Sequence, residues 1–274
     1  HVLKTALFAL LRPGDGLLCV TGEPYETMLP VIGVTPGGEG KPVDGSVRDF
    51  GVDYREVSSL LDYQEGRIGL SQLERQVEEA LTPRTKVIHI QRSRGYSLRK
   101  SISISTLEAF LELQRRRWPG LLVTVDNCYC EFTQEKEPPA LGASLTAGSL
   151  IKNPGGGICP TGGYVAGTSE CVSRVAEALY APGLSGEVGS NPYGYRDVFQ
   201  GLFMAPRTVG ESLMGAAFAA ALFEGLGMPV DPSPLGERCD IVQAVTLGDP
   251  EKLRAFARAI QEASPVDSYA APEP

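Results

Sequence analysis

Short apolar runs alternate with helical patterns along most of this chain, and this alternation restricts the fold more than any other feature. Four runs have the length and apolar character of strands buried in a parallel sheet: residues 16–22, 86–91, 121–126 and 162–167. The segments between them have the spacing of helices. This order predicts an α/β protein with a mainly parallel sheet that is covered by helices on both faces.

The expected helices have start and stop signals. A helix is predicted over residues 71–81, where Ser71 and Glu74 form a capping box. A second helix begins at Ser105 or Thr106 and ends before a Trp-Pro-Gly sequence. These signals place a βαβ passage in the middle of the chain.

A later helix is predicted over residues 209–226. It contains an Ala-rich apolar stretch, residues 213–223, which is shorter than the roughly 20 residues that span a bilayer. We therefore expect this stretch to be a buried helix, and we expect no membrane segment.

A segment rich in Pro and Gly follows that helix and predicts a domain boundary near residue 228. We expect a large domain over residues 1–227 and the beginning of a smaller α+β domain over residues 228–274. The smaller part should contain a strand over residues 241–247 and a helix capped by Asp249.

Charge and cysteine usage exclude several classes of function. A formal net charge of −8 disfavours a nucleic-acid or membrane-surface partner. The six cysteines include no C-x-x-C pair and the chain has only two histidines, so we expect no structural metal site. Reduced thiols in a cytoplasmic compartment are the simplest interpretation, and an organellar location stays open.

Other catalytic patterns are missing from the sequence. The glycine-rich run contains neither G-x-x-x-x-G-K-[ST] nor G-x-G-x-x-G after a strand, which disfavours nucleotide binding. There is no G-x-S-x-G motif, and His89 lies within an apolar run, where a core role is expected.

Asp126 and Lys152 occur in an order that suits pyridoxal phosphate (PLP) chemistry. This cofactor needs a lysine amine for its aldehyde and an acid near its pyridine nitrogen. Asp126 ends a predicted strand, at the edge where open α/β sheets bind ligands. Lys152 follows 26 residues later in a glycine-rich loop. Taken singly, the aspartate could cap a helix and the lysine could be a solvated surface group.

The amino-acid sequences of several segments closely resemble those of the aluminium-resistance or methionine gamma-lyase-like proteins. These proteins are relatives of the Cys/Met-metabolism enzymes with the aspartate-aminotransferase fold. The similar segments are RPGD at 12–15, PYETM at 24–28, QRSRGY at 91–96, VDNCYCEF at 125–132, GSLIKNPGGG at 148–157 and TGGYVAG at 161–167. The resemblance covers essentially the whole chain. It implies a fold-type-I PLP enzyme.

The resemblance also implies roles for individual residues. Lys152 would form the Schiff base with PLP and move the alpha proton. Asp126 would pair with the pyridinium nitrogen, and Tyr25 would stack on the ring. Ser149 would contact the phosphate, although a serine at that position could instead hydrogen-bond its own loop.

Arg92 and Arg94 are both candidates for the residue that binds the substrate carboxylate, and either could instead pair with a structural acid. Asn127 and Asn153 are candidates for supporting the site. The resemblance implies a lyase that acts on a small sulfur-containing amino acid. An aminotransferase, a racemase, or a non-catalytic protein with a stress role are the alternatives.

By the same resemblance, the chain lacks a stretch before His1 that completes the phosphate site, and it lacks most of the C-terminal domain. The whole protein is expected to be a homodimer or homotetramer with sites at the subunit interface. The chain by itself is expected to bind PLP weakly or not at all.

Overall fold

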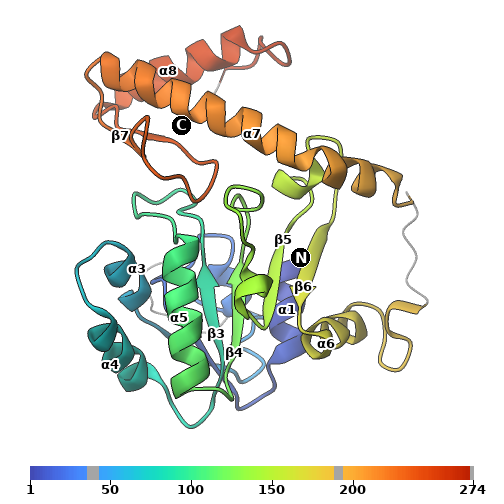
Figure 1. Cartoon of the computed structure of the whole chain (residues 1–274). Coiled ribbons are helices and arrows are strands. Elements are labelled where there is room, and N and C mark those ends of the chain that lie inside the picture. Colours follow the sequence, from blue (N-terminus) through green and yellow to red (C-terminus); the bar gives the residue numbers. More distant parts are fainter. Residues whose placement is uncertain (36–42, 188–193, 272–274) are drawn as a thin grey trace. The chain divides into compact units, whose positions relative to one another are not determined.

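A computed structural model of the protein describes residues 1–35, 43–187 and 194–271 (Figure 1). Its centre is a six-stranded sheet with the order β2-β1-β3-β4-β5-β6. The strands are β1 Gly16–Cys19, β2 Asp53–Glu56, β3 Thr85–Gln91, β4 Leu122–Asp126, β5 Leu145–Ser149 and β6 Gly163–Gly167. The first five are parallel, and β6 runs antiparallel to β5. The predicted α/β class with a mainly parallel sheet is confirmed.

The helices lie before, between and after these strands in the sequence. The longer ones are α1 Val2–Leu10, α3 Ser59–Gln64, α4 Leu70–Ala80, α5 Ile104–Arg117, α6 Ser169–Leu179, α7 Arg196–Gly225 and α8 Pro250–Ala263. Shorter turns are α2 Leu29–Ile32, η1 Pro138–Leu141, η2 Asn153–Gly155 and η3 Ser185–Glu187. Among the residues described, no helix is both long enough and apolar enough to cross a membrane.

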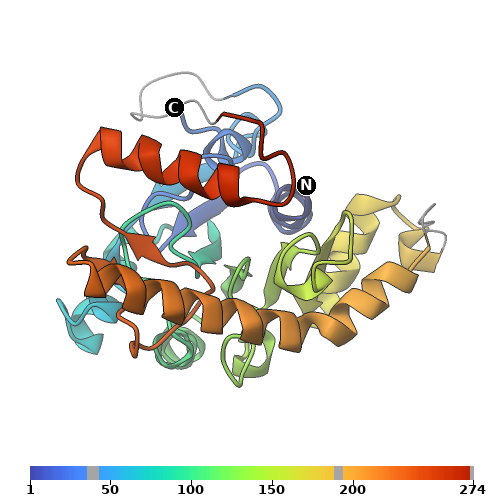
Figure 2. The same ribbon diagram turned by 90° about the horizontal axis from the view of Figure 1, so that it is seen from above.

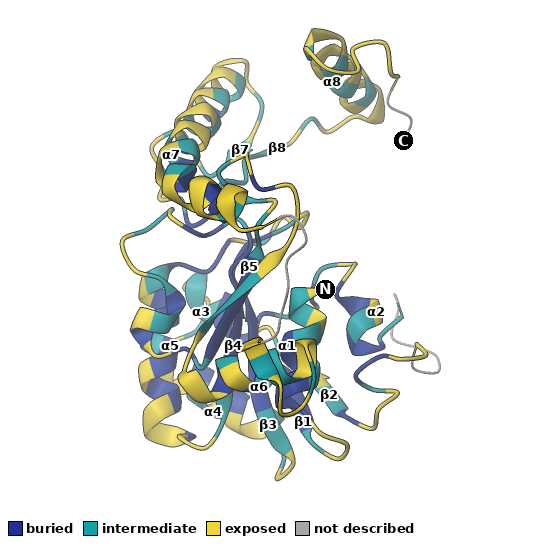
Figure 3. Ribbon diagram, turned by 90° about the vertical axis from the view of Figure 1, so that its right-hand side faces the viewer, coloured by how far each residue is buried: buried dark blue, intermediate teal, exposed yellow. Residues whose placement is uncertain are grey.

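Alternate residues of the central strands pack into two separate cores. Leu18 of β1 and Ile88 of β3 pack with residues from α3, α4 and α5 on one face of the sheet. Their neighbours Leu17 and Val87 pack with residues from α1 and α6 on the other face. Figure 2 and Figure 3 show α1 and α5 on opposite sides of the sheet. The central strands are thus buried on both faces, which explains why they are apolar runs without alternation.

In the central sheet, two strands were not predicted and one was predicted with the wrong direction. β2 has the sequence DYRE and β5 the sequence LTAGS, and neither is an apolar run. β6 is antiparallel and half-exposed at the sheet edge, so its prediction as a buried parallel strand is wrong. An edge strand contacts fewer helices, and its residues therefore need not be strongly apolar.

The predicted helix caps differ from those observed. α4 begins after Gly69 without a side-chain cap, so the predicted capping box is wrong. α5 is capped by Ser103, whose Oγ accepts a hydrogen bond from the Thr106 N–H at 3.1 Å, and not by Ser105 or Thr106. In both places the backbone turns into the helix earlier than the sequence signal suggests.

The long helix α7 is also different from its prediction. It begins at Arg196, well before residue 209, and continues through Pro206. Its Ala-rich stretch is not buried, because Phe218 is 71% exposed and Met214 is 62% exposed. The apolar composition of residues 213–223 therefore does not reflect burial within the described part of the chain.

The chain divides into two compact units. One contains His1–Leu213 together with Arg238–Val242, and the other contains Met214–Glu237 and the described residues from Gln243 onward. In the second unit Phe223 packs edge-on against Phe256, with ring centres 5.6 Å apart. Asp249 caps α8 as predicted, but the strand predicted over residues 241–247 is reduced to β8 Ala244–Val245, paired with β7 Val230–Asp231. The domain boundary at residues 227 and 228 stays a prediction.

The sulfur and imidazole groups have the expected core positions. All six cysteines are buried and free. His89 is 2% exposed, its Nδ1 lies 2.9 Å from Thr124 Oγ1, and burial lowers its pKa to about 4. Among the described residues, no group of three His, Cys, Asp or Glu side chains has the arrangement of a metal site.

Candidate active site

The carboxyl ends of neighbouring parallel strands meet at one cavity. Gln91 ends β3 and pairs in register with Asp126, which ends β4. Lys152 lies in the turn after β5, the next strand of the sheet. The cavity between these ends has a volume of about 140 Å³, and its lining is Tyr25, Thr27, Gln91, Ser93, Gly95, Tyr96, Asp126, Cys128, Tyr129 and Lys152. Ligands of open α/β sheets bind at this edge.

Asp126 is a buried carboxyl group at this cavity, with 3% of its surface exposed. Its Oδ1 accepts a hydrogen bond from the Cys128 N–H at 3.0 Å. Burial raises the pKa of Asp126, while the contacts with Cys128 and the positive charges of Lys152 and Arg99 act in the opposite direction. Because a buried carboxylate is stabilised by a nearby cation, the site favours a positively charged group next to Asp126.

The Lys152 amine lies against an aromatic ring. Its Nζ is 4.0 Å from the centre of the Tyr129 ring, within the range of a cation–π contact. Burial lowers the pKa of Lys152, but the acidic groups of Cys128, Tyr129 and Asp126 outweigh burial and raise it above its ordinary value. At neutral pH the amine is therefore charged when the cavity contains no ligand.

Tyr129 is a site residue that the sequence reasoning missed. Its backbone has φ +71°, a left-handed conformation that is uncommon for residues other than glycine. Such conformations cost energy and are concentrated at functional sites. The only available signal was an aromatic residue three positions after Asp126, and the sequence does not show that the backbone turns there.

Tyr25 is brought to the cavity from a distant part of the sequence. Its N–H donates to Gln91 Oε1 at 3.0 Å, which ties the turn before α2 to the end of β3. Burial, followed by the charge of Asp126, raises the pKa of Tyr25, so its hydroxyl stays neutral at physiological pH. The structure thus brings Tyr25, Asp126 and Lys152 together.

Arg92, Arg94 and Ser149 do not line this cavity. Arg92 is fully buried, and its guanidinium donates to Asn127 Oδ1 at 2.6 Å and to Gln134 Oε1 at 2.9 Å. Arg94 is 4% exposed. Their roles with a substrate carboxylate, and that of Ser149 with a phosphate, stay predictions, and this geometry does not favour them.

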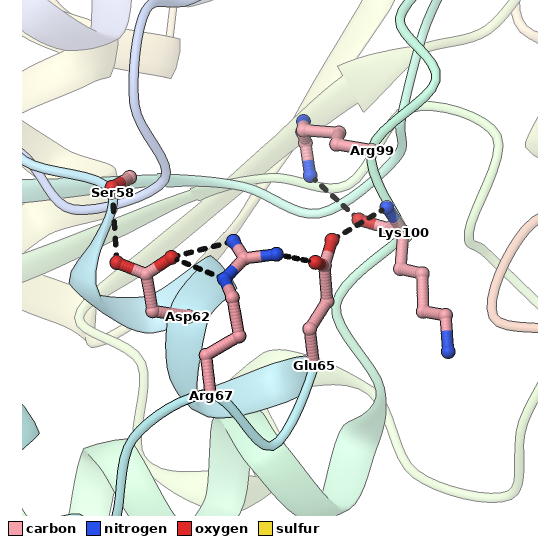
Figure 4. Close-up of polar contacts among 6 residues, drawn as sticks. All are labelled: Ser58, Asp62, Glu65, Arg67, Arg99 and Lys100. Carbon is pink, nitrogen blue, oxygen red and sulfur yellow. Dashed lines mark hydrogen bonds and ion pairs between the residues drawn. The ribbon is translucent and has the colours of Figure 1, made fainter.

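The β3–α5 loop, residues 92–103, forms one wall of the cavity. Hydrogen bonds of Arg99 and Lys100 stabilise this loop. Arg99 donates to the Gln91 carbonyl at 3.0 Å and to the Lys100 carbonyl at 3.1 Å. The Lys100 N–H donates to Glu65 Oε1 at 3.5 Å, and Arg67 lies between Glu65 and Asp62 (Figure 4). Burial lowers the pKa of Arg99 to about 10, against the opposing charges of Cys130 and Asp240.

A second polar cluster includes Asn153, the neighbour of Lys152 in the sequence, and none of its members lines the Lys152 cavity. Glu131 is 2% exposed and accepts a hydrogen bond from the Tyr164 hydroxyl at 2.8 Å. Burial is the main cause that raises its pKa to about 8. Asn153 donates to the Glu131 carbonyl at 3.0 Å, and Asn127 donates to Glu137 at 2.8 Å. Asn153 therefore holds the backbone at Glu131, and Asn127 holds the side chain of Glu137.

The fold and this edge of the sheet define the class of protein first. The structure of the pyridoxal-5'-phosphate-dependent protein YhfS from Escherichia coli is similar, with a TM-score of 0.64 and 19% identity, and it covers 98% of this chain and 65% of that chain. This likeness shows the shared fold alone. The chain therefore has the α/β fold of that protein, with a mostly parallel sheet.

The family is defined by stronger similarity. The methionine gamma-lyase family matches residues 1–274, and the chain belongs to this family. The carbon-sulfur lyase involved in aluminum resistance from Clostridium novyi NT has a TM-score of 0.89 and 40% identity over 99% of this chain and 62% of its own. The uncharacterized protein YnbB from Bacillus subtilis is 42% identical over 274 residues, 100% of this chain and 62% of YnbB. The chain therefore spans less than two thirds of these relatives.

Proposed function

We propose that this protein is part of a carbon-sulfur lyase that uses PLP and acts on a small sulfur-containing amino acid. The single observation that carries the proposal is the position of the Lys152 amine and the buried Asp126 carboxyl group at one cavity, between the ends of parallel strands. Membership of the methionine gamma-lyase family and the name of the Clostridium novyi relative support the reaction class.

The chemistry of the cavity side chains fits the cofactor. Lys152 would hold its aldehyde carbon, the Asp126 carboxylate would pair with its ring nitrogen, and the Tyr25 ring would lie against its face. When bound, PLP supplies an electron sink that allows bonds at the alpha carbon of an amino acid to break. The hydroxyl group of Thr27 also lies at the same cavity.

Lys152 is the group that we propose to move the proton. To accept the alpha proton of a substrate, its Nζ must first be uncharged, and the acidic neighbours that raise its pKa work against that state. If the Asp126 carboxylate pairs with a protonated ring nitrogen, its negative charge no longer raises the pKa of Lys152. The site is therefore expected to supply a neutral lysine only when it is loaded.

Asp126 supports the reaction by keeping a negative charge where water is excluded. Because it is buried, its charge acts on a partner at close range with little screening. Tyr129 limits where the freed lysine amine can move, since its ring lies 4.0 Å from Nζ. In this way the residues of the chain would hold a proton acceptor and an anion at the same cavity.

The proposed reaction is tested with the longest natural chain that contains this sequence, purified with PLP. L-cystathionine and L-methionine are supplied separately, and the release of thiol and of a 2-oxo acid is measured. Equal release of both products supports the lyase. Stoichiometric consumption of an added 2-oxo acid without thiol would show an aminotransferase and overturn the proposal. K152A provides the background rate.

A further inference from the structure

The Arg238–Val242 segment belongs to the compact unit that contains the sheet, whereas the residues on both sides of it in the sequence belong to the other unit. Asp240 lies at the centre of this segment and is only 2% exposed. It is more than 80 residues from Lys152 in the sequence. The proposed reaction does not use this buried acid.

The carboxylate of Asp240 holds the two halves of the β3–α5 loop together. Its Oδ2 accepts hydrogen bonds from the Ser93 hydroxyl at 2.8 Å and from the Arg94 N–H at 3.3 Å. The Ser101 hydroxyl donates to the same oxygen, and Oδ1 accepts from the Val242 N–H at 3.1 Å. Hydrogen bonds to a buried charged group are among the stronger ones in proteins.

The same segment also contacts the loop that follows β4. The Ile241 N–H donates to the carbonyl of Tyr129 at 3.1 Å. The hydroxyl of Thr133 donates to the carbonyl of Cys239 at 3.1 Å. The ring of Tyr129 lies against the Lys152 amine. The hydrogen bond from Ile241 to Tyr129 therefore also holds a residue that lines the cavity.

Ser93 connects Asp240 to the rest of the cavity lining. The Gln91 side chain donates to the Ser93 carbonyl at 3.0 Å and accepts from the Tyr25 N–H at 3.0 Å. Side-chain and backbone contacts thus run from Asp240 through Ser93 and Gln91 to Tyr25. Every member of this series after Asp240 lines the cavity.

We propose that Asp240 is a positioning residue for the Lys152 cavity, and that Arg238–Val242 fixes two of its walls: the Ser93 wall and the Tyr129 wall. The positioning follows from the contacts themselves. Its consequence, a cavity shaped for PLP, rests on the proposed function. Loss of the Asp240 carboxylate should therefore loosen the cavity while the two cores of the sheet remain packed.

The test uses a thiol in the cavity, so that it does not depend on the cofactor or on activity. Cys128 lines the cavity, and Cys171 lies in the core between α6 and the sheet; both are buried. The rate of iodoacetamide labelling of each cysteine is measured by peptide mass spectrometry without PLP. A buried thiol reacts only when its surroundings open locally, so the ratio of the two rates reports opening of the cavity alone.

Asp240→Asn replaces one accepting oxygen with an NH2 group, which cannot accept these hydrogen bonds. We expect about a tenfold faster labelling of Cys128 in this variant, with Cys171 unchanged. Ser101→Ala removes a single donor and should give a smaller increase. The matched control is Asp15→Asn, because Asp15 also accepts a backbone hydrogen bond, from Arg12 at 2.8 Å, but lies before β1. It should leave Cys128 unchanged.

Two outcomes would overturn the inference. In the first, Cys128 labels at the wild-type rate in both Asp240→Asn and Ser101→Ala. In the second, Cys128 and Cys171 accelerate together, which would make Asp240 a general stability residue. A failure of the proposed function is seen separately, when the longest natural chain that contains this sequence develops no PLP absorbance band although Asp240→Asn opens the cavity selectively. If the inference and the proposed function are both correct, the Kd for PLP should rise in Asp240→Asn. The melting temperature of that variant should stay near that of Asp15→Asn.

Discussion

Glu131 is a buried acid beside the active site whose environment favours the protonated form. The Tyr164 hydroxyl donates to its Oε1, whereas the other oxygen, Oε2, has no hydrogen-bond partner among the described residues. A charged carboxylate there would remain poorly solvated, which is the reason for its raised pKa. The neutral acid can still accept the hydrogen bond from Tyr164.

This raised pKa makes stability depend on pH. The pKa of Glu131 rises from 4.5 to about 8 on folding, so its stabilising contribution is full below pH 4.5 and is lost as the pH rises through 8. Glutamine resembles the neutral acid but cannot ionise. The free energy of unfolding of wild type should therefore fall by up to about 1.4 kcal/mol per pH unit between these two pKa values, and Glu131→Gln should not show this fall. Urea unfolding of both proteins between pH 5 and 8.5 measures the difference.

The expected result is that Glu131→Gln gains stability relative to wild type as the pH rises. A constant difference at all pH values would show that Glu131 is ionised in the folded protein. Glu135→Gln is the surface control for removing one carboxylate, because Glu135 is exposed in the same segment.

At this scale the sequence locates some site residues and misses others. Asp126 could be found because it ends a predicted strand, at the edge where such sheets bind ligands. Lys152 was found from its glycine-rich loop and the family resemblance, because β5 before it was not predicted. Tyr129 could not, since its position depends on a left-handed backbone. Arg92 does follow the end of β3, but its guanidinium turns inward to Asn127 and Gln134, and side-chain direction is not available from strand order.

At the scale of elements, the turn that carries Lys152 packs directly against α7. Gly155 in η2 and Gly201 in α7 are in backbone contact, and a Cβ on Gly201 would overlap the Gly155 carbonyl. Only a residue without a side chain allows this approach. The position of the Lys152 turn thus depends on a helix that starts 44 residues later in the sequence.

Gly201→Ala should destabilise the protein by about 1–3 kcal/mol, because the overlap involves backbone that cannot move freely. Gly210 lies in the same helix with nothing near the place of a Cβ, so Gly210→Ala should instead stabilise by about 0.5–1 kcal/mol. Chemical denaturation of the two variants provides the comparison. Equal effects in the two variants would mean that the glycine contact does not determine the packing.

The elements also show what the sequence could and could not predict. β3, β4 and α5 were found because each has an uninterrupted pattern that reflects its own burial. β2 and β5 were missed because they consist largely of polar or small residues. Their positions in the sheet depend on pairing with β1 and β4, which the sequence pattern does not show. The start of α7 was missed because Pro206 suggests a break that the helix does not contain.

At the scale of the whole molecule, α7 exposes more apolar surface than a folded chain usually does. Phe203 is 84% exposed and Phe218 is 71% exposed. Large exposed apolar groups mark surfaces that contact other protein. This exposure agrees with the homodimer or homotetramer that the family resemblance predicts.

The prediction is that the longest natural chain containing this sequence sediments as a dimer or tetramer at micromolar concentrations. Phe203→Ser should shift the equilibrium towards the monomer, whereas a serine at Leu235, which is fully exposed outside α7, should not. Analytical ultracentrifugation measures both. A monomeric wild-type protein at all concentrations would contradict the predicted assembly.

The central claim is that Lys152 holds the cofactor, and chemical trapping tests it most directly. The longest natural chain that contains this sequence is incubated with PLP, reduced with sodium borohydride, digested and analysed by mass spectrometry. The account predicts that a pyridoxyl group is found on Lys152, that it is absent in Lys152→Ala, and that Asp126→Asn weakens its formation. Labelling spread over surface lysines, or equal total labelling in wild type and Lys152→Ala, would contradict it.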